Sequence, residues 1–110
     1  MMTVQLHGSW AEIAISGELN SNTAPEADAK IAEALTSAQS LIVDMGKLDY
    51  LSSAGLRTIL LAAKTVREKN GKLAIAGASD KIKRVFQLSG LLRHFHCFDQ
   101  KDDAQTYILE

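Results

Sequence analysis

The organisation of this chain centres on residues 41–57, which read LIVDMGKLDYLSSAGLR. The stretch begins with the apolar run Leu41–Val43, and so short a run between polar residues is typical of a strand covered on both faces. We interpret the polar residues that follow as a loop, which ends at two adjacent serines, Ser52 and Ser53. A helix is predicted to begin at Ser53. Both hydroxyls should therefore lie at a helix N-terminus near the carboxyl edge of a sheet, where open α/β sheets place functional loops.

The predicted helix spans about residues 53–69, because its apolar side chains repeat at the spacing of one helical face. The members of that inner face are Leu56, Ile59, Leu60, Ala63 and Val66. The outer face consists of Arg57, Thr58, Leu61, Lys64 and Glu68. Such a face is usually only solvated, but Leu61 is apolar and lies beside Arg57 near the serines, so a partner surface is an equal alternative. Asn70-Gly71 predicts the helix end, since both residues tolerate a left-handed conformation.

Before this stretch, two segments alternate apolar and polar residues and predict a hairpin of strands over residues 2–7 and 11–16. The pattern places Met2, Val4 and Leu6 together on one side of the first strand. Residues 17–22 predict a polar loop. Thr23 and Glu26 then form a capping-box pattern at the start of a helix. The expected buried face of that helix consists of Ala24, Ala27, Ile31, Ala34, Leu35 and Ala38.

After the central helix, residues 72–76 read as a strand, and Ser79 or Asp80 is expected to cap a third helix. Within residues 91–98 we interpret a short last strand, and Asp102 is expected to cap a terminal helix. The predicted order is β-β-α-β-α-β-α-β-α. Because strands alternate with helices, we predict an α/β fold with a mixed, mostly parallel sheet, an N-terminal hairpin and helices packed on the sheet.

The size and charge of the chain restrict its function class. Its 110 residues predict a single domain over residues 1–110. Twelve basic and thirteen acidic residues give a formal charge of −1, which provides no overall electrostatic signature for nucleic acid or an anionic membrane. No apolar run is long enough to span a bilayer and no leader opens the chain, so we expect a cytoplasmic protein. The single Cys97 fits a reducing compartment.

Two groups of side chains suggest a metal and are interpreted otherwise. His94, His96 and Cys97 are close in sequence, but the cysteine should point to the opposite side of a strand from its histidine neighbours, and no second ligand cluster exists. Asp44 and Asp49 follow the central strand and could hold Mg²⁺. Asp caps turns routinely, so we favour turn capping.

Enzyme chemistry has little support in the sequence. Ser53 does not lie in a Gly-x-Ser-x-Gly elbow, and no histidine and carboxylate are visibly placed to activate it. Gly71-Lys72 lies at a helix end and lacks the geometry of a phosphate-binding loop. An enzyme or nucleotide-binding protein that uses Ser53 with Asp44 therefore stays a minor alternative.

Four stretches of the chain resemble one family in the same order. Residues 51–57, LSSAGLR, resemble the signature of STAS-domain anti-sigma factor antagonists. Residues 16–19 (SGEL), 43–45 (VDM) and 88–92 (LSGLL) resemble further stretches of that family. The resemblance covers nearly the whole chain. Each stretch alone is a weak signal, but four in register are specific.

The resemblance implies a compact α/β STAS fold and a binding module without catalysis or cofactor. Members of the family bind a serine-kinase anti-sigma factor, which uses ATP, and so release a sigma factor. The kinase phosphorylates one serine at the start of the central helix, and a PP2C-type phosphatase reverses the modification. By position the acceptor is Ser53, with Ser52 as runner-up. Ser52 and Asn20 stand where many members have Asp.

The resemblance, together with the predicted outer helix face, gives a set of expected partner-binding residues. These are Asn20, Ser21, Ser52, Ser53, Gly55, Leu56, Arg57 and Leu61. The main alternative keeps the fold and changes the role, to a STAS subunit of a larger signalling scaffold or lipid-transport assembly without sigma-factor control.

Overall fold

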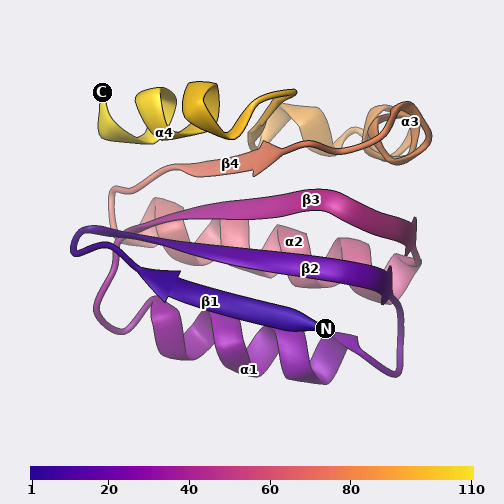
Figure 1. The fold of residues 1–110 in the computed structure, drawn as a ribbon, viewed down its shortest axis with the longest axis horizontal. Helices are drawn as coiled ribbons and strands as arrows, with labels where there is room; N and C mark the ends of the chain where they lie inside the picture. The colour runs from indigo at the N-terminus through magenta and orange to yellow at the C-terminus, as the bar shows by residue number, and fades with distance from the viewer.

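The computed structural model, which describes residues 1–110, contains one five-stranded sheet (Figure 1). The strands follow the spatial order β1-β2-β3-β4-β5. Their bounds are β1 Met2–Leu6, β2 Trp10–Leu19, β3 Ser40–Leu51, β4 Leu73–Ala76 and β5 His96–Phe98. β1 pairs antiparallel with β2, and every other neighbouring pair is parallel. The predicted α/β fold with an N-terminal hairpin and a mostly parallel sheet is therefore confirmed.

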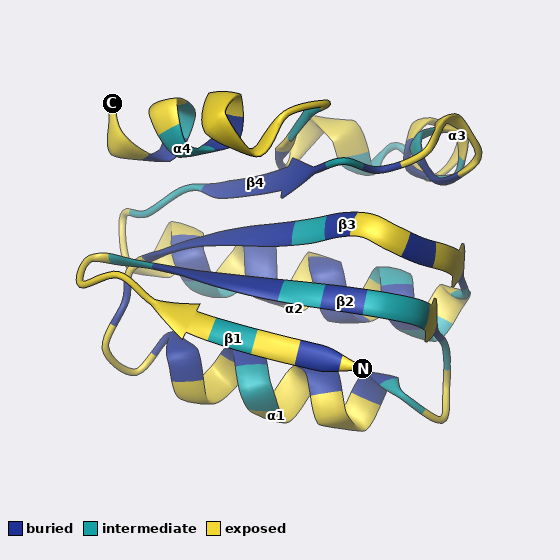
Figure 2. Cartoon of the chain, in the orientation of Figure 1, coloured by how far each residue is buried: buried dark blue, intermediate teal, exposed yellow.

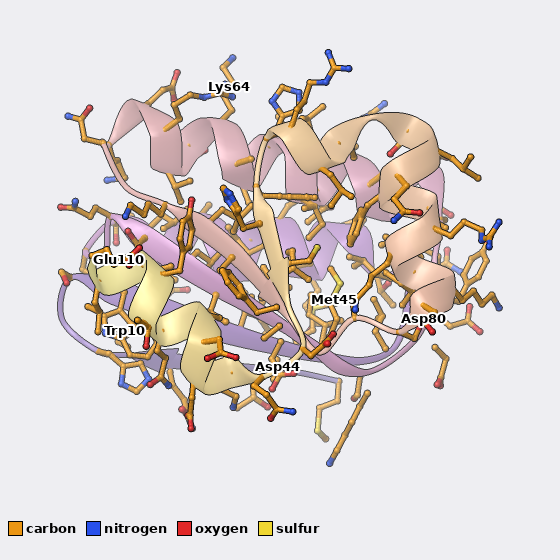
Figure 3. All side chains as sticks on the ribbon, turned by 90° about the horizontal axis from the view of Figure 1, so that it is seen from above. Trp10, Asp44, Met45, Lys64, Asp80 and Glu110 are labelled. Atoms are coloured by element: carbon orange, nitrogen blue, oxygen red, sulfur yellow. The ribbon has the colours of Figure 1, made fainter.

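Helices cover both faces of this sheet. Their bounds are α1 Ala24–Ala34, α2 Ser53–Glu68, α3 Asp80–Ser89 and α4 Lys101–Leu109. α2, which carries Lys64, lies on one side of the sheet, and α4, which ends beside Glu110, lies on the other (Figure 3). The predicted element order is confirmed, with one short 3-10 helix, η1 (Leu91–Arg93), as an unpredicted addition. No helix has both the length and the apolar character to cross a membrane.

The first half of β3, which holds the apolar run Leu41–Val43, is buried as predicted (Figure 2). Leu41 and Val43 belong to the large core cluster formed with α1, α2 and α3. Ile42 points the other way, into a smaller cluster that includes Ala104 and Ile108 of α4. Each of the three strand residues is 0% exposed. Successive side chains of β3 thus pack against the helices on opposite faces of the sheet.

β3 is longer than predicted, since it continues to Leu51 instead of ending in a loop after Val43. β2 likewise continues to Leu19, through a segment that was predicted to be a polar loop. These two polar extensions pair with each other, with register shifts between Ala14 and Ser16 and between Gly17 and Glu18. Many side chains of these extensions are polar, so their sequences lack the apolar run that predicts a strand.

Two helix-facing assignments were wrong. Thr58, expected on the outer face of α2, is 2% exposed, whereas Leu60, expected on the inner face, is 39% exposed. The Thr58 hydroxyl donates to the Ala54 carbonyl (3.4 Å), which satisfies it inside the structure. α2 is therefore rotated so that Thr58 and Ala62 lie beside α1, where both line a groove with α1 residues. In β1, Leu6 is 60% exposed although it shares the apolar side of Met2.

Caps and stops were predicted with mixed success. The Thr23 side chain does not cap α1, because its hydroxyl donates to the Glu18 carbonyl (2.9 Å) instead. Asp102 lies inside the first turn of α4, so it is not the cap. Ser79 does cap α3, accepting from the Ile82 amide at 3.3 Å. The stop after α2 is confirmed, since Asn70 adopts a φ of 61°.

Candidate functional site

Ser52 is the N-cap of α2 and has a structural role. Its backbone is extended, and its hydroxyl oxygen accepts from the Gly55 amide at 3.3 Å. Its own amide donates to the Leu19 carbonyl at 3.0 Å, which ties the start of the helix to the end of β2. Because both polar groups of Ser52 are engaged, this serine positions the helix start.

Ser53 is the first residue of α2 and is exposed. Its hydroxyl makes no hydrogen bond with any other group of the chain, and no histidine or carboxylate contacts it as a base would. The first turn of α2 contains no acidic residue, so no carboxylate of that turn offsets the positive end of the helix dipole. Ser53 is therefore an accessible hydroxyl at a place that stabilises added negative charge.

Gly55 allows α2 to approach the sheet closely. A Cβ at this position would lie 2.7 Å from the Leu19 carbonyl oxygen and 2.6 Å from Cδ1 of Leu51. Both distances are shorter than van der Waals contact, so a side chain here forces the helix or the strands apart. The glycine thus fixes how Ser53 is presented beside the end of β2.

The loop after β2 is built by Asn20. Its side-chain oxygen accepts from the amides of Asn22 (2.9 Å) and Thr23 (3.2 Å), and its amide nitrogen donates to the Glu18 carboxylate at 3.1 Å. Ser21 is exposed in this loop. Since Leu19 pairs with Leu51, the loop emerges at the same sheet edge as the two serines. The structure therefore brings together residues that lie about thirty positions apart in the sequence.

The outer face of α2 carries charge and apolar surface beyond the serines. Arg57, one turn after Ser53, is exposed and makes no ion pair within the chain. Leu56 is half-buried against the core, whereas Leu61 is 48% exposed. The residues that the sequence analysis missed are Leu60, assigned to the core, and Tyr50, which is 46% exposed. Strand alternation with the buried Leu51 would have predicted an outward Tyr50.

Of the two carboxylates that could hold Mg²⁺, Asp44 has other partners and Asp49 is exposed. Asp44 accepts from the Gly46 amide at 2.9 Å through one oxygen, and its other oxygen lies 3.4 Å from the Lys101 ammonium. Asp49 is exposed in β3. No group of three or more His, Cys, Asp or Glu side chains is arranged to hold a metal ion. Asp44 thus fits the turn-capping interpretation, with an added ion pair.

The histidine and cysteine side chains near β5 also have structural surroundings. His94 is exposed just after η1, and His96 packs its ring 4.6 Å from that of Tyr107 on α4. Cys97 is half-buried, and desolvation by that burial raises the pKa of its thiol above the ordinary value. A thiol held in this way is less reactive than a free one.

Comparisons of the sequence and of the structure with known proteins identify proteins similar to this chain. A family model described as STAS domain matches residues 1–104. The chain is 35% identical to BtrV of Bordetella bronchiseptica, a protein named as an anti-sigma factor antagonist, across 82% of this chain and 78% of BtrV. An anti-sigma factor antagonist structure from Mycobacterium paratuberculosis is similar with a TM-score of 0.89 at 23% identity, covering 100% and 94% of the two chains. The phosphorylated form of the Bacillus cell fate determinant SpoIIAA is similar with a TM-score of 0.80 at 20% identity, covering 98% and 99%.

Proposed function

The chain belongs to the STAS domain family, and we propose that it is an anti-sigma factor antagonist switched by phosphorylation of Ser53. In this proposal the unmodified chain binds a serine-kinase anti-sigma factor and so releases a sigma factor. The kinase transfers phosphate from ATP to Ser53, and a PP2C-type phosphatase removes it. The chemistry is done to this chain, which acts as a binding module.

The different environments of the two serines carry the proposal. The Ser52 hydroxyl accepts the Gly55 amide and caps α2, whereas the Ser53 hydroxyl is exposed and free of hydrogen bonds within the chain. A kinase needs a hydroxyl that can reach the transferred phosphoryl group, and Ser53 meets that need without loss of a cap. Similarity to relatives named as anti-sigma factor antagonists supports the same role.

A phosphate on Ser53 fits the local structure. It carries about −1.5 to −2 charges at neutral pH. Free first-turn amides and the positive end of the α2 dipole stabilise those charges, and Arg57 lies one turn away to add a charge-assisted contact. Modification should therefore leave the domain folded. SpoIIAA, whose phosphorylated form has a solved structure, is a relative of the same fold.

The switch acts on the complex. A partner packed over Ser53 must desolvate the new dianion, which costs several kcal/mol unless matched cations compensate. A loss of about 3–4 kcal/mol weakens binding by roughly 150- to 900-fold. Asn20, Ser21, Leu56 and Leu61 extend the proposed contact surface on either side of the serines. No change of fold is needed for release.

The test is phosphorylation by the cognate kinase with ATP, followed by intact mass and peptide mapping. We expect one phosphate on wild type, mapped to Ser53, and none on Ser53→Ala. Ser52→Ala is the matched control, because it removes the neighbouring hydroxyl, and it should still accept one phosphate. Phosphate on Ser53→Ala but not on Ser52→Ala would assign the acceptor to Ser52 and overturn the proposal for Ser53.

A further inference from the structure

The charges of this nearly neutral chain are strongly separated along the sequence. Residues 53–94, which include α2 and α3, contain nine basic and two acidic residues, a formal charge of +7. The other residues contain three basic and eleven acidic residues, a formal charge of −8. The total of −1 therefore conceals a positive half and a negative half.

Six of the nine cations of the positive half lie on α2 and α3, whereas Lys72 donates to the Tyr107 carbonyl of α4. Ile59 and Val66 of α2 pack into the same core cluster as Ile82 and Phe86 of α3, so both helices cover the same face of the sheet. Lys64 on α2 projects away from the sheet on that side, opposite α4 (Figure 3). On α3, Lys83 pairs with Asp99, whereas Lys81 and Arg84 are exposed and unpaired, as are Arg57 and Lys64 on α2.

Exposed leucines lie among these cations. On α2, Leu60 is 39% and Leu61 48% exposed, between Arg57 and Lys64. On α3, Leu88 is 81% exposed and follows Arg84 at helical spacing. Neither Lys64 nor Arg84 forms an ion pair within the chain. Both helices therefore expose the same combination of unpaired cations and uncovered apolar side chains.

We propose that the exposed faces of α2 and α3 dock an acidic, amphipathic segment of a protein partner. Carboxylates of that segment pair with the cations, and its apolar residues cover Leu60 and Leu88, since Leu61 lines the groove between α2 and α1. The proposal extends the contact surface of the proposed function beyond Ser53. A phosphate on Ser53 would also reduce the net positive charge of α2, and its negative charge would repel an acidic partner.

A protein segment fits this surface better than a polyanion or a membrane. α1 packs beside α2 and carries three acidic residues, Glu26, Asp28 and Glu33, against the single Lys30. A DNA duplex or an extended anionic bilayer on this side would meet those carboxylates as well. A short acidic segment can contact α2 and α3 alone, and its apolar residues make use of the exposed leucines, which phosphate groups cannot.

The test is a nuclear magnetic resonance titration of the labelled protein with a synthetic helical peptide of Glu and Leu at amphipathic spacing. We expect saturable amide shifts confined to α2, α3 and η1, and an affinity that falls as salt is added. Lys64→Gln with Arg84→Gln should weaken binding about five- to tenfold. Lys30→Gln with Lys47→Gln removes the same charge elsewhere and should change binding less than twofold.

A second pair of variants tests the apolar part of the surface. Leu88→Gln should weaken binding at least threefold, whereas Leu109→Gln, a matched exposed leucine on α4, should leave it unchanged. Equal losses in the two charge pairs, or no saturable shifts, would overturn the proposal. Tighter binding to duplex DNA or to phosphatidylserine vesicles than to the peptide would overturn the protein assignment. No kinase or ATP is present, so the outcome does not depend on whether Ser53 is a phosphoacceptor.

Discussion

Replacing Gly55 with alanine should destabilise the protein although it places a better helix former in α2. The new Cβ would lie 2.7 Å from the Leu19 carbonyl oxygen. That oxygen accepts the Ser52 amide at 3.0 Å, so it cannot move without loosening the helix start. Overpacking costs about 1–3 kcal/mol, and a clash with a fixed backbone oxygen falls in the upper part of that range, about 2–3 kcal/mol. The gain in helix propensity is at most about 1 kcal/mol, which leaves a net loss of about 1–2 kcal/mol.

Urea unfolding measures this loss directly. We expect the free energy of unfolding to fall by about 1–2 kcal/mol, with a melting temperature lower by about 4–12 °C. Ser53→Ala is the matched control, because it changes an exposed residue in the same turn and should shift stability by less than about 0.5 kcal/mol. A Gly55→Ala protein as stable as wild type, or more stable, would refute the close approach of α2 to β2.

Four further predictions concern other parts of the fold. Ser52→Ala removes the α2 cap and should cost about 1 kcal/mol in urea unfolding while Ser53→Ala costs less; equal costs would contradict the separate roles. Lys101→Met removes the only cation paired with the nearly buried Glu12 carboxylate, so α4 amides should exchange faster in hydrogen-exchange experiments and stability should fall by about 1–2 kcal/mol. The hydrogen bond to Glu12 raises the pKa of Lys101 above its ordinary value of 10.5. The contribution of Lys101 to stability is therefore full below that ordinary pKa and is lost as the pH rises through the folded-state pKa. Thermal melts across alkaline pH should show this loss in wild type and not in Lys101→Met. The raised pKa of Cys97 predicts slower alkylation by iodoacetamide at pH 8 than for a free thiol, and a rate equal to that of an unfolded control would contradict it.

The sequence predicted the parts of the fold that depend on local pattern. The apolar run at Leu41–Val43, the start of α2 at Ser53 and the stop at Asn70 follow from periodicity and backbone preference. The extensions of β2 and β3 could not be predicted in this way. They are stabilised by pairing with each other across two register shifts, and such pairing leaves no pattern in either segment.

The candidate site was predicted in position but not in detail. Motif and helix spacing placed the two serines at the helix start, whereas their different hydrogen bonds became visible only in three dimensions. The close approach at Gly55 depends on Leu19, which lies thirty-six positions earlier in the chain. The exposure of Leu60 depends on the rotation of α2 against α1. Contacts between distant segments decide these features.

The proposed switch is measured by the affinity of this protein for the serine-kinase anti-sigma factor that we propose as its partner, with and without phosphate on Ser53. Isothermal titration calorimetry on the unmodified protein and on protein phosphorylated only at Ser53 gives both values. We predict tight binding of the unmodified protein and an affinity lower by roughly 150- to 900-fold after phosphorylation, with the fold unchanged by circular dichroism. Equal affinity for the two forms would contradict it.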